Sequence, residues 1–136
     1  MNIACFRHTC ATCGYGFNAP ALSDFQYGAF IMCSDSGLHD AFLDAFDDKI
    51  WNEVDDLIQK NKPLLREKFW EVFALTCDLA PDGTKFEIGL RKCPRCRSTS
   101  LSRETDNTGI SLDVPAITHN AWCKLTAEQK RSRILK

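Results

Sequence analysis

The chain lacks any apolar run near the roughly 20 residues that a membrane-spanning helix requires. The segment from Met1 to Pro20 also lacks the basic-then-apolar pattern of an export signal. Nothing in the sequence therefore favours export or membrane insertion. We expect a cytoplasmic protein that makes no membrane contact.

The sequence also lacks the motifs of common enzymes. Its three histidines, His8, His39 and His119, are scattered, and none lies in an HExxH motif or beside a recognised nucleophile motif. There is no P-loop, and the glycines at Gly14 and Gly16 have neither the third glycine nor the helix of a dinucleotide fingerprint. We assign no catalytic residue and expect a protein that is not an enzyme.

Internal repeats and low-complexity segments are absent as well, apart from two similar cysteine pairs. The 136 residues are 44% hydrophobic and 26% charged, which is ordinary for a folded soluble chain. A chain of this length supplies material for one core and little for a second. We expect a single domain over residues 1–136.

What the chain does contain is eight cysteines, four of them in two CxxC pairs. The pairs read CATCG from Cys10 and CPRCR from Cys93, so that Cys13 and Cys96 complete them. In a chain without an export signal, this spacing favours metal-bound thiolates over disulfides. Four thiolates suit a tetrahedral Zn²⁺ with Zn–S distances of about 2.3 Å and leave no open coordination position. The sequence predicts one structural zinc ion.

At Thr9–Gly16 and Glu87–Ser100 the chain resembles the zinc-ribbon superfamily. That resemblance implies two knuckles, each at the tip of a β-hairpin, that share one zinc ion. Gly14 suits a knuckle that needs positive φ, and Pro94 fixes φ inside the second turn. The chain departs from many ribbons in spacing, because 79 residues separate Cys13 from Cys93 where roughly 15–20 are usual.

Two other interpretations of the cysteines stay open. Paired cysteines can be unmetallated or redox-active, but neither pair begins a helix in a βαβ unit, where a helix dipole would lower a thiol pKa. Cys5 and His8 lie near Cys10 and could supply a substitute ligand. Cys33, Cys77 and Cys123 are interpreted as packing residues.

The strand predictions follow the alternation of apolar residues. A weak strand is expected over residues 1–9, a second over 23–33, and a third over 85–90, where it enters the second knuckle. After Cys96, a strand, a polar turn or mobile loop, and a last strand over 110–117 are expected, with Pro115 limiting that strand to an edge.

The helix predictions follow apolar spacing of three and four. The Ser34–Gly37 cluster predicts a helix start, and two or three helices are expected over about residues 37–78, with a break near Asp47 and the last starting at Pro63. Thr126–Gln129 matches a capping box and predicts a short C-terminal helix. The predicted fold is α+β, with a small antiparallel zinc-ribbon sheet packed against the inserted helices.

Charge is distributed unevenly along the chain. Residues 20–62 hold nine acids and three bases, although the net charge of the whole chain is only −1. Such acids are either a solvated helix face or a docking surface for a basic protein. Our leading hypothesis is a zinc-binding interaction domain, in its most concrete form an immunity or antitoxin-like inhibitor of a basic bacterial toxin. The candidate partner-binding residues are Asp40, Asp44, Asp47, Asp48, Asp55 and Asp56, and Glu53 lies in the same acidic stretch.

The alternative partner is nucleic acid. Residues 85–136 hold eleven bases and five acids, and the bases gather at the second knuckle and in the last helix. Along the sequence no aromatic residues interleave with these bases, which ranks the nucleic-acid hypothesis second. The bases concerned are Arg91, Lys92, Arg95, Arg97, Lys130, Arg131, Arg133 and Lys136.

Overall fold

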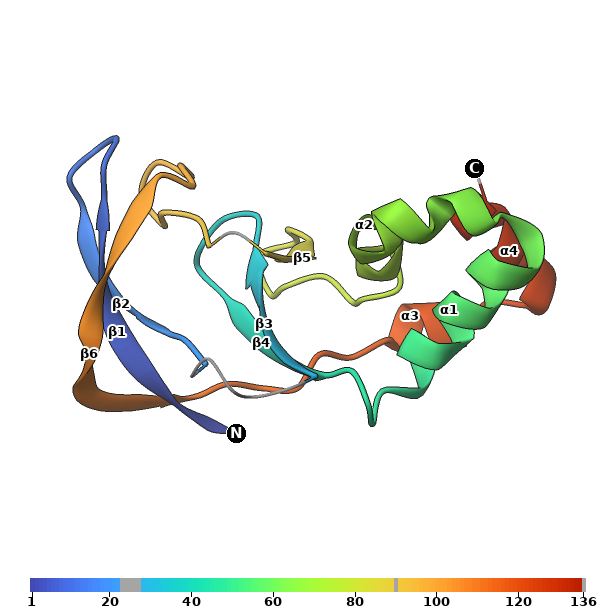
Figure 1. The fold of residues 1–136 in the computed structure, drawn as a ribbon, viewed down its shortest axis with the longest axis horizontal. Helices are drawn as coiled ribbons and strands as arrows, with labels where there is room; N and C mark the ends of the chain where they lie inside the picture. Colours follow the sequence, from blue (N-terminus) through green and yellow to red (C-terminus); the bar gives the residue numbers. More distant parts are fainter. Residues whose placement is uncertain (23–27, 90, 136) are drawn as a thin grey trace.

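The computed structural model describes residues 1–22, 28–89 and 91–135. Within this part of the chain, two antiparallel three-stranded sheets and a set of helices follow one another along an elongated molecule (Figure 1). The α+β prediction is confirmed. In the same residues no helix has the length and apolar content that crossing a bilayer demands.

The first sheet has the strand order β2-β1-β6, from β1 (Asn2–Cys10), β2 (Gly16–Pro20) and β6 (Leu101–Asp113). β1 and β2 form a hairpin whose turn carries the first cysteine pair. β6 pairs with the other edge of β1 over its length, with two irregularities in register. The turn or mobile loop predicted inside residues 97–109 was wrong, because β1 provides a partner strand for this polar segment. We call this sheet with its two knuckles the ribbon half.

A second sheet, which the sequence did not predict, has the order β4-β3-β5. Its strands are β3 (Ala29–Ser34), β4 (Asp40–Asp44) and β5 (Phe86–Ile88). The predicted strand over 23–33 is thus found from Ala29 onward, and its residues 23–27 lie outside the described part of the chain.

The helix predicted to start near residue 37 was wrong, because this segment turns and forms β4. Gly37 has φ +77°, and the hydroxyl of Ser34 accepts a hydrogen bond from the backbone N–H of His39 at 3.0 Å, which closes a tight turn. Ala41 and Leu43 are then buried on one face of β4. Pairing with β3 overrides the helical spacing of the apolar residues.

The helices begin later than predicted. α1 (Lys49–Asn61) is followed by the 3₁₀ turn η1 (Pro63–Lys68) and by α2 (Phe69–Ala74). After β6 come α3 (Asn120–Cys123) and α4 (Ala127–Leu135). The capping box before α4 is confirmed, because the Gln129 N–H donates to the Thr126 hydroxyl and the Gln129 side chain accepts from the Thr126 N–H.

The helices pack against the second sheet. The prediction that they pack against the ribbon sheet was wrong. The main core cluster draws on β3, β4, β5 and the helices, and it contains no residue of β1, β2 or β6. We call this part the helical half. Trp122 is 1% exposed at the centre of this half, whereas its neighbour Cys123 is exposed, so packing by Cys123 was a wrong expectation. The cluster consists of Met32, Ala41, Leu43, Val54, Ile58, Val72, Phe73, Ala80, Phe86, Trp122 and Ile134.

Candidate metal centre

The four predicted cysteines converge at one end of the ribbon half. The Sγ atoms of Cys10, Cys13, Cys93 and Cys96 all lie within 4.8 Å of one another. Two of the separations are 3.5 Å for Cys10–Cys96 and 3.7 Å for Cys13–Cys93. Four sulfurs placed tetrahedrally at the Zn–S bond length would be about 3.8 Å apart, whereas a disulfide requires about 2.05 Å. The arrangement fits a tetrahedral zinc ion.

The two knuckles have the same backbone geometry. In the first, the Cys10 N–H donates to the Tyr15 carbonyl at 2.9 Å and the Gly14 N–H donates to the Cys10 carbonyl at 2.9 Å. In the second, the Cys93 N–H donates to the Ser98 carbonyl and the Arg97 N–H donates to the Cys93 carbonyl, each at 2.8 Å. Gly14 and Arg97 occupy equivalent positions with φ of +76° and +64°. Arg97 is the one non-glycine residue with positive φ among those described.

The thiols show the competition expected of sulfurs gathered around a cation site. The Cys13 backbone N–H, opposed by burial and aided by the Thr12 N–H, lowers the pKa of the Cys10 thiol to about 6. For Cys96, the Ser98 N–H acts to lower the pKa, but burial and the three neighbouring sulfurs together raise the pKa to about 12. Four thiolates this close repel one another unless a cation lies among them. A divalent ion bound among the four sulfurs would supply the compensating positive charge.

The substitute ligands considered from the sequence lie outside this cluster. Among the described residues, the group that can hold a metal contains the four cysteines and neither Cys5 nor His8. His8 is 6% exposed, and its Nδ1 lies 2.9 Å from the Phe6 carbonyl oxygen. Cys5 is buried, and burial raises the pKa of its thiol. Both residues belong to the packing of the ribbon half.

The second knuckle rests on the helical half. A Cβ on Gly37 would lie 2.8 Å from the Lys92 carbonyl oxygen and 3.1 Å from the Cys93 carbonyl carbon, so only glycine allows this close approach. Beside it, Arg91 pairs with Asp40 at 2.6 Å, and Lys92 pairs with Asp35 and, at 3.3 Å, with Glu87. These contacts fix the second pair of sulfurs relative to β3, β4 and β5.

The six candidate acids do not form one helical face. Asp40 and Asp44 lie on β4, and Asp40 is paired with Arg91. Asp48 is the N-cap of α1 and also bonds His119. The carboxylate of Asp55 accepts a hydrogen bond from Gln59 at 3.1 Å. The expectation of a shared helical surface was therefore wrong, although Asp47 and Asp56 are exposed.

The candidate basic residues also lie in different parts of the structure. Figure 1 shows α4 at the end of the molecule opposite the knuckles, so the basic knuckle and the basic helix do not form one surface. Arg91 and Lys92 are held in the ion pairs described above. Arg95 and Arg97 remain exposed at the tip of the second knuckle.

The fold brings aromatic rings and arginines together on one face of the ribbon sheet. These residues are far apart in the sequence, so the sequence did not predict this arrangement. The Arg95 guanidinium lies 6.0 Å from the centre of the Tyr15 ring, Tyr15 stacks on Phe17 at 5.9 Å, and Phe17 stacks on His8 at 5.3 Å. His8 is paired across the strands with Arg103, whose guanidinium lies 4.8 Å from the Phe6 ring centre. We call this set the arginine–aromatic row: Arg95, Tyr15, Phe17, His8, Arg103 and Phe6.

Comparisons with protein-family models, with curated protein sequences and with solved protein structures find no match to this chain. What the site can do is therefore derived from its own geometry: the cysteine cluster makes this a candidate zinc-binding domain.

Proposed function

We propose that this protein is a non-enzymatic, zinc-stabilised domain that binds nucleic acid along the arginine–aromatic row. The row is the observation that carries the proposal. Arginines neutralise phosphates, and exposed aromatic rings stack on bases, so the combination of the two on one sheet face is typical of surfaces that follow a nucleic-acid strand. Tyr15 is 39% exposed beside Arg95 and offers a ring at the open end of the row.

The charge at the knuckle end of the ribbon half supports a phosphate-bearing partner. Residues 1–17 and 91–103 contain six bases and no acid, whereas the rest of β6 adds Glu104, Asp106 and Asp113. Zinc with four thiolates carries a formal charge of −2, which leaves the region positive. Two of the bases, Arg91 and Lys92, are paired with acids of the helical half. Within the described chain no acid lies at ion-pair distance from Arg7, Arg95, Arg97 or Arg103.

The metal would have a structural role in this function. Cys10, Cys13, Cys93 and Cys96 would hold the ion and fill its coordination shell, so that no position is left for a substrate. Zinc bound there joins the β1–β2 hairpin to the start of β6 and so holds the row in place. A reducing compartment such as the cytoplasm would keep these thiolates available to the metal.

Fluorescence anisotropy with labelled oligonucleotides at several salt concentrations tests the proposal. We expect the logarithm of the binding constant to fall linearly with the logarithm of salt concentration. Replacing Arg95 and Arg103 by Ala should weaken binding about tenfold or more and lower the salt slope by about 2. The matched control replaces Arg131 and Arg133 of α4 and should leave binding unchanged. Zinc-loaded protein without salt-dependent binding, or equal losses in both variants, would contradict the proposal.

The leading hypothesis from the sequence, an acidic protein-binding domain of the immunity or antitoxin type, is the second candidate. Its support is the charge of residues 28–89, which hold thirteen acids and six bases. A basic protein would then dock on the acids that remain at the surface, Asp47, Asp55 and Asp56. Affinity purification from the native cell should recover a basic protein in stoichiometric amount. Replacing these three residues by Asn should release that protein, while the Arg95/Arg103 variant should retain it.

A further inference from the structure

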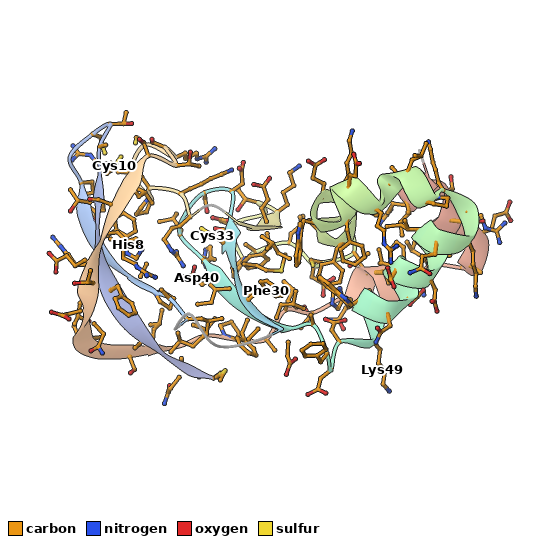
Figure 2. All side chains as sticks on the ribbon, in the orientation of Figure 1. His8, Cys10, Phe30, Cys33, Asp40 and Lys49 are labelled. Carbon is orange, nitrogen blue, oxygen red and sulfur yellow. The ribbon has the colours of Figure 1, made fainter. Side chains whose placement is uncertain are left out.

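A cleft of about 510 Å³ lies between the ribbon half and the helical half. Its volume falls in the range of small-molecule sites. His8 and Arg103 of the arginine–aromatic row line one side, and Phe30, Trp70 and Ile88 line the other. Figure 2 shows His8 on the ribbon sheet facing Cys33 on the second sheet, whereas Phe30 lies on the other face of β3, toward the helices. The cleft is continuous with the proposed nucleic-acid surface because His8 and Arg103 belong to both.

The wall on the helical half is aromatic and firmly held. The Phe30 and Trp70 rings meet edge to face with centres 4.9 Å apart, and Trp51 lies 4.9 Å from Trp70 on the same cluster. Trp70 nevertheless keeps 38% of its surface exposed. A large exposed indole supported by other rings is suited to stacking on a flat aromatic ligand.

The opposite wall supplies a polar atom at a fixed place. His8 is 6% exposed, its ring is stacked on Phe17, and its Nδ1 is engaged by the Phe6 carbonyl oxygen. Within residues 1–22, 28–89 and 91–135, no protein group bonds its Nε2. A buried ring held by stacking and by one nitrogen leaves the other nitrogen for a ligand.

Arg103 supplies the cleft's uncompensated positive charge. The other arginine of the lining, Arg91, is neutralised by Asp40 at 2.6 Å and donates to the Pro20 carbonyl at 3.1 Å. Arg103 has no acidic partner within the described chain and rests on the Phe6 ring. Its guanidinium is therefore available to a phosphate.

We propose that this cleft binds one unpaired nucleotide, with the base on Trp70 and the phosphate on Arg103 and the Nε2 of His8. The inference rests on the proposed function and narrows it to single-stranded nucleic acid, because a base paired inside a duplex cannot enter a cleft without leaving its stack. The same chemistry would accept a free nucleoside monophosphate. The experiment therefore compares both sources.

The test titrates zinc-loaded protein with a mixture of nucleoside monophosphates, with single-stranded decamers of mixed sequence, and with the duplex of the same decamer. We expect the single strand to bind at least tenfold more tightly than the duplex and to quench tryptophan fluorescence. Trp70→Ala should weaken single-strand binding about tenfold and remove most of the quenching, while Trp70→Phe should keep most of the affinity. His8→Phe, which keeps the stacked ring and removes Nε2, should also weaken binding. Leu64→Ala, at an exposed position on η1, serves as the control.

Each outcome bears on the proposals in a different way. Equal affinity for single strand and duplex, unchanged in Trp70→Ala, would overturn the cleft and leave the proposed function standing. Binding of monophosphates alone, lost in Trp70→Ala, would support the cleft and overturn the wider function. No binding of any probe would overturn both. If the variants lose zinc, the ¹⁵N resonance of His8 Nε2 in the wild-type protein decides: it should shift on addition of the monophosphates, and an unmoved resonance overturns the cleft.

Discussion

Arg97 has the left-handed backbone conformation that a glycine, Gly14, has at the equivalent position of the first knuckle. The left-handed conformation costs a residue with a side chain about 1–2 kcal/mol, and strain of this kind gathers at functional positions. We therefore expect the Arg97 side chain to contribute to binding and not to stability.

We predict that Arg97→Gly leaves stability unchanged or raises it by about 0.5–1 kcal/mol, because the strain is relieved at some cost in unfolded-state entropy. The same variant should bind nucleic acid more weakly. Chemical denaturation of the zinc-loaded protein and anisotropy measure the two effects. Arg95→Ala, which carries no such backbone strain, should lose affinity without gaining stability. A clear loss of stability in Arg97→Gly would contradict this account.

Gly37 allows a close approach that no other residue permits. We predict that Gly37→Ala destabilises the protein by more than the roughly 1–2 kcal/mol that positive φ alone costs, because the new methyl group would meet the Lys92 carbonyl. Gly83 is the matched control, with φ +83° and no atom within 4 Å of the place where a methyl group would lie. Urea unfolding should show a larger loss for Gly37→Ala, together with weaker zinc retention. Equal losses would mean that the contact with the second knuckle contributes nothing.

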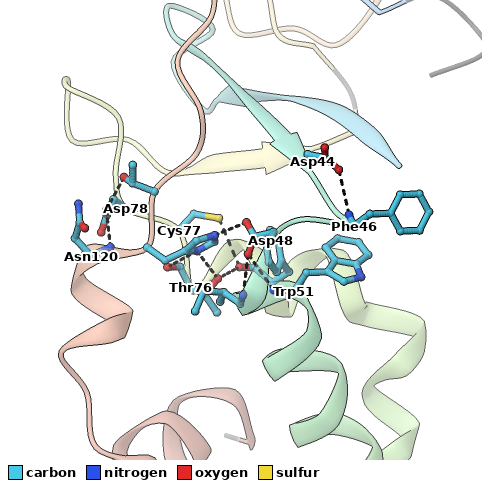
Figure 3. A network of polar contacts seen from close by, with 12 residues as sticks. Asp44, Phe46, Asp48, Trp51, Thr76, Cys77, Asp78 and Asn120 are labelled. Atoms are coloured by element: carbon cyan, nitrogen blue, oxygen red, sulfur yellow. Dashed lines mark hydrogen bonds and ion pairs between the residues drawn. The ribbon is translucent and has the colours of Figure 1, made fainter. Parts of the chain in front are cut away.

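At the scale of elements, one carboxylate ties three segments together (Figure 3). Asp48 caps α1 by accepting from the Ile50 and Trp51 N–H groups at 2.8 and 3.1 Å. Its other oxygen lies 2.8 Å from His119 Nε2, and His119 Nδ1 lies 3.1 Å from the Thr76 carbonyl oxygen just after α2. The network joins the start of α1, the end of α2 and the chain before α3.

We predict that Asp48→Ala costs about 2–4 kcal/mol, since it removes a helix cap and leaves a buried histidine nitrogen unsatisfied. Asp48→Asn should cost less, because one oxygen remains to cap the helix. Asp47→Ala, at the neighbouring exposed position, should change stability by less than about 0.5 kcal/mol. Thermal or urea unfolding measures all three. Similar losses at Asp47 and Asp48 would show that the network is not responsible.

The sequence predicted elements well where local chemistry decides them. The capping box at Thr126 and the proline at Pro63 mark their helical segments because the relevant hydrogen bonds lie within a few residues. Residues 38–46 were misread because Leu38, Phe42 and Phe46 have helical spacing, while their state depends on β3 and on the turn at Gly37. Pairing between distant strands leaves little trace in local periodicity.

The same difference between local and long-range features applies to the candidate site at the scale of the whole molecule. The cysteine cluster could be predicted because each CxxC pair is local and the two pairs are alike. The arginine–aromatic row could not, because Tyr15 and Phe17 come from the first hairpin and Arg95 and Arg103 come from residues about 80 positions later. Only the ribbon sheet places them side by side.

The molecule joins a half that carries the candidate zinc site to a half with its own hydrophobic core. We predict that zinc removal by a chelator, or protonation of the thiolates at low pH, unfolds the ribbon half first, because metal binding supplies folding free energy there. Hydrogen exchange should show lost protection in β1, β2 and β6 while α1 stays protected. Cys96→Ser should produce the same pattern without a chelator, and Cys123→Ser should not. Simultaneous loss of protection in both halves would contradict this prediction.

The order of the chain has a consequence for biosynthesis. All four cysteines of the candidate zinc site have been translated once residue 96 has been added, whereas the core of the helical half still awaits Trp122 and Ile134. A nascent chain can therefore bind a metal ion before Trp122, which lies at the centre of the helical half, is available to pack against the segment between the knuckles. For that interval a bound ion would hold together the two ends of a loop whose interior has not yet folded.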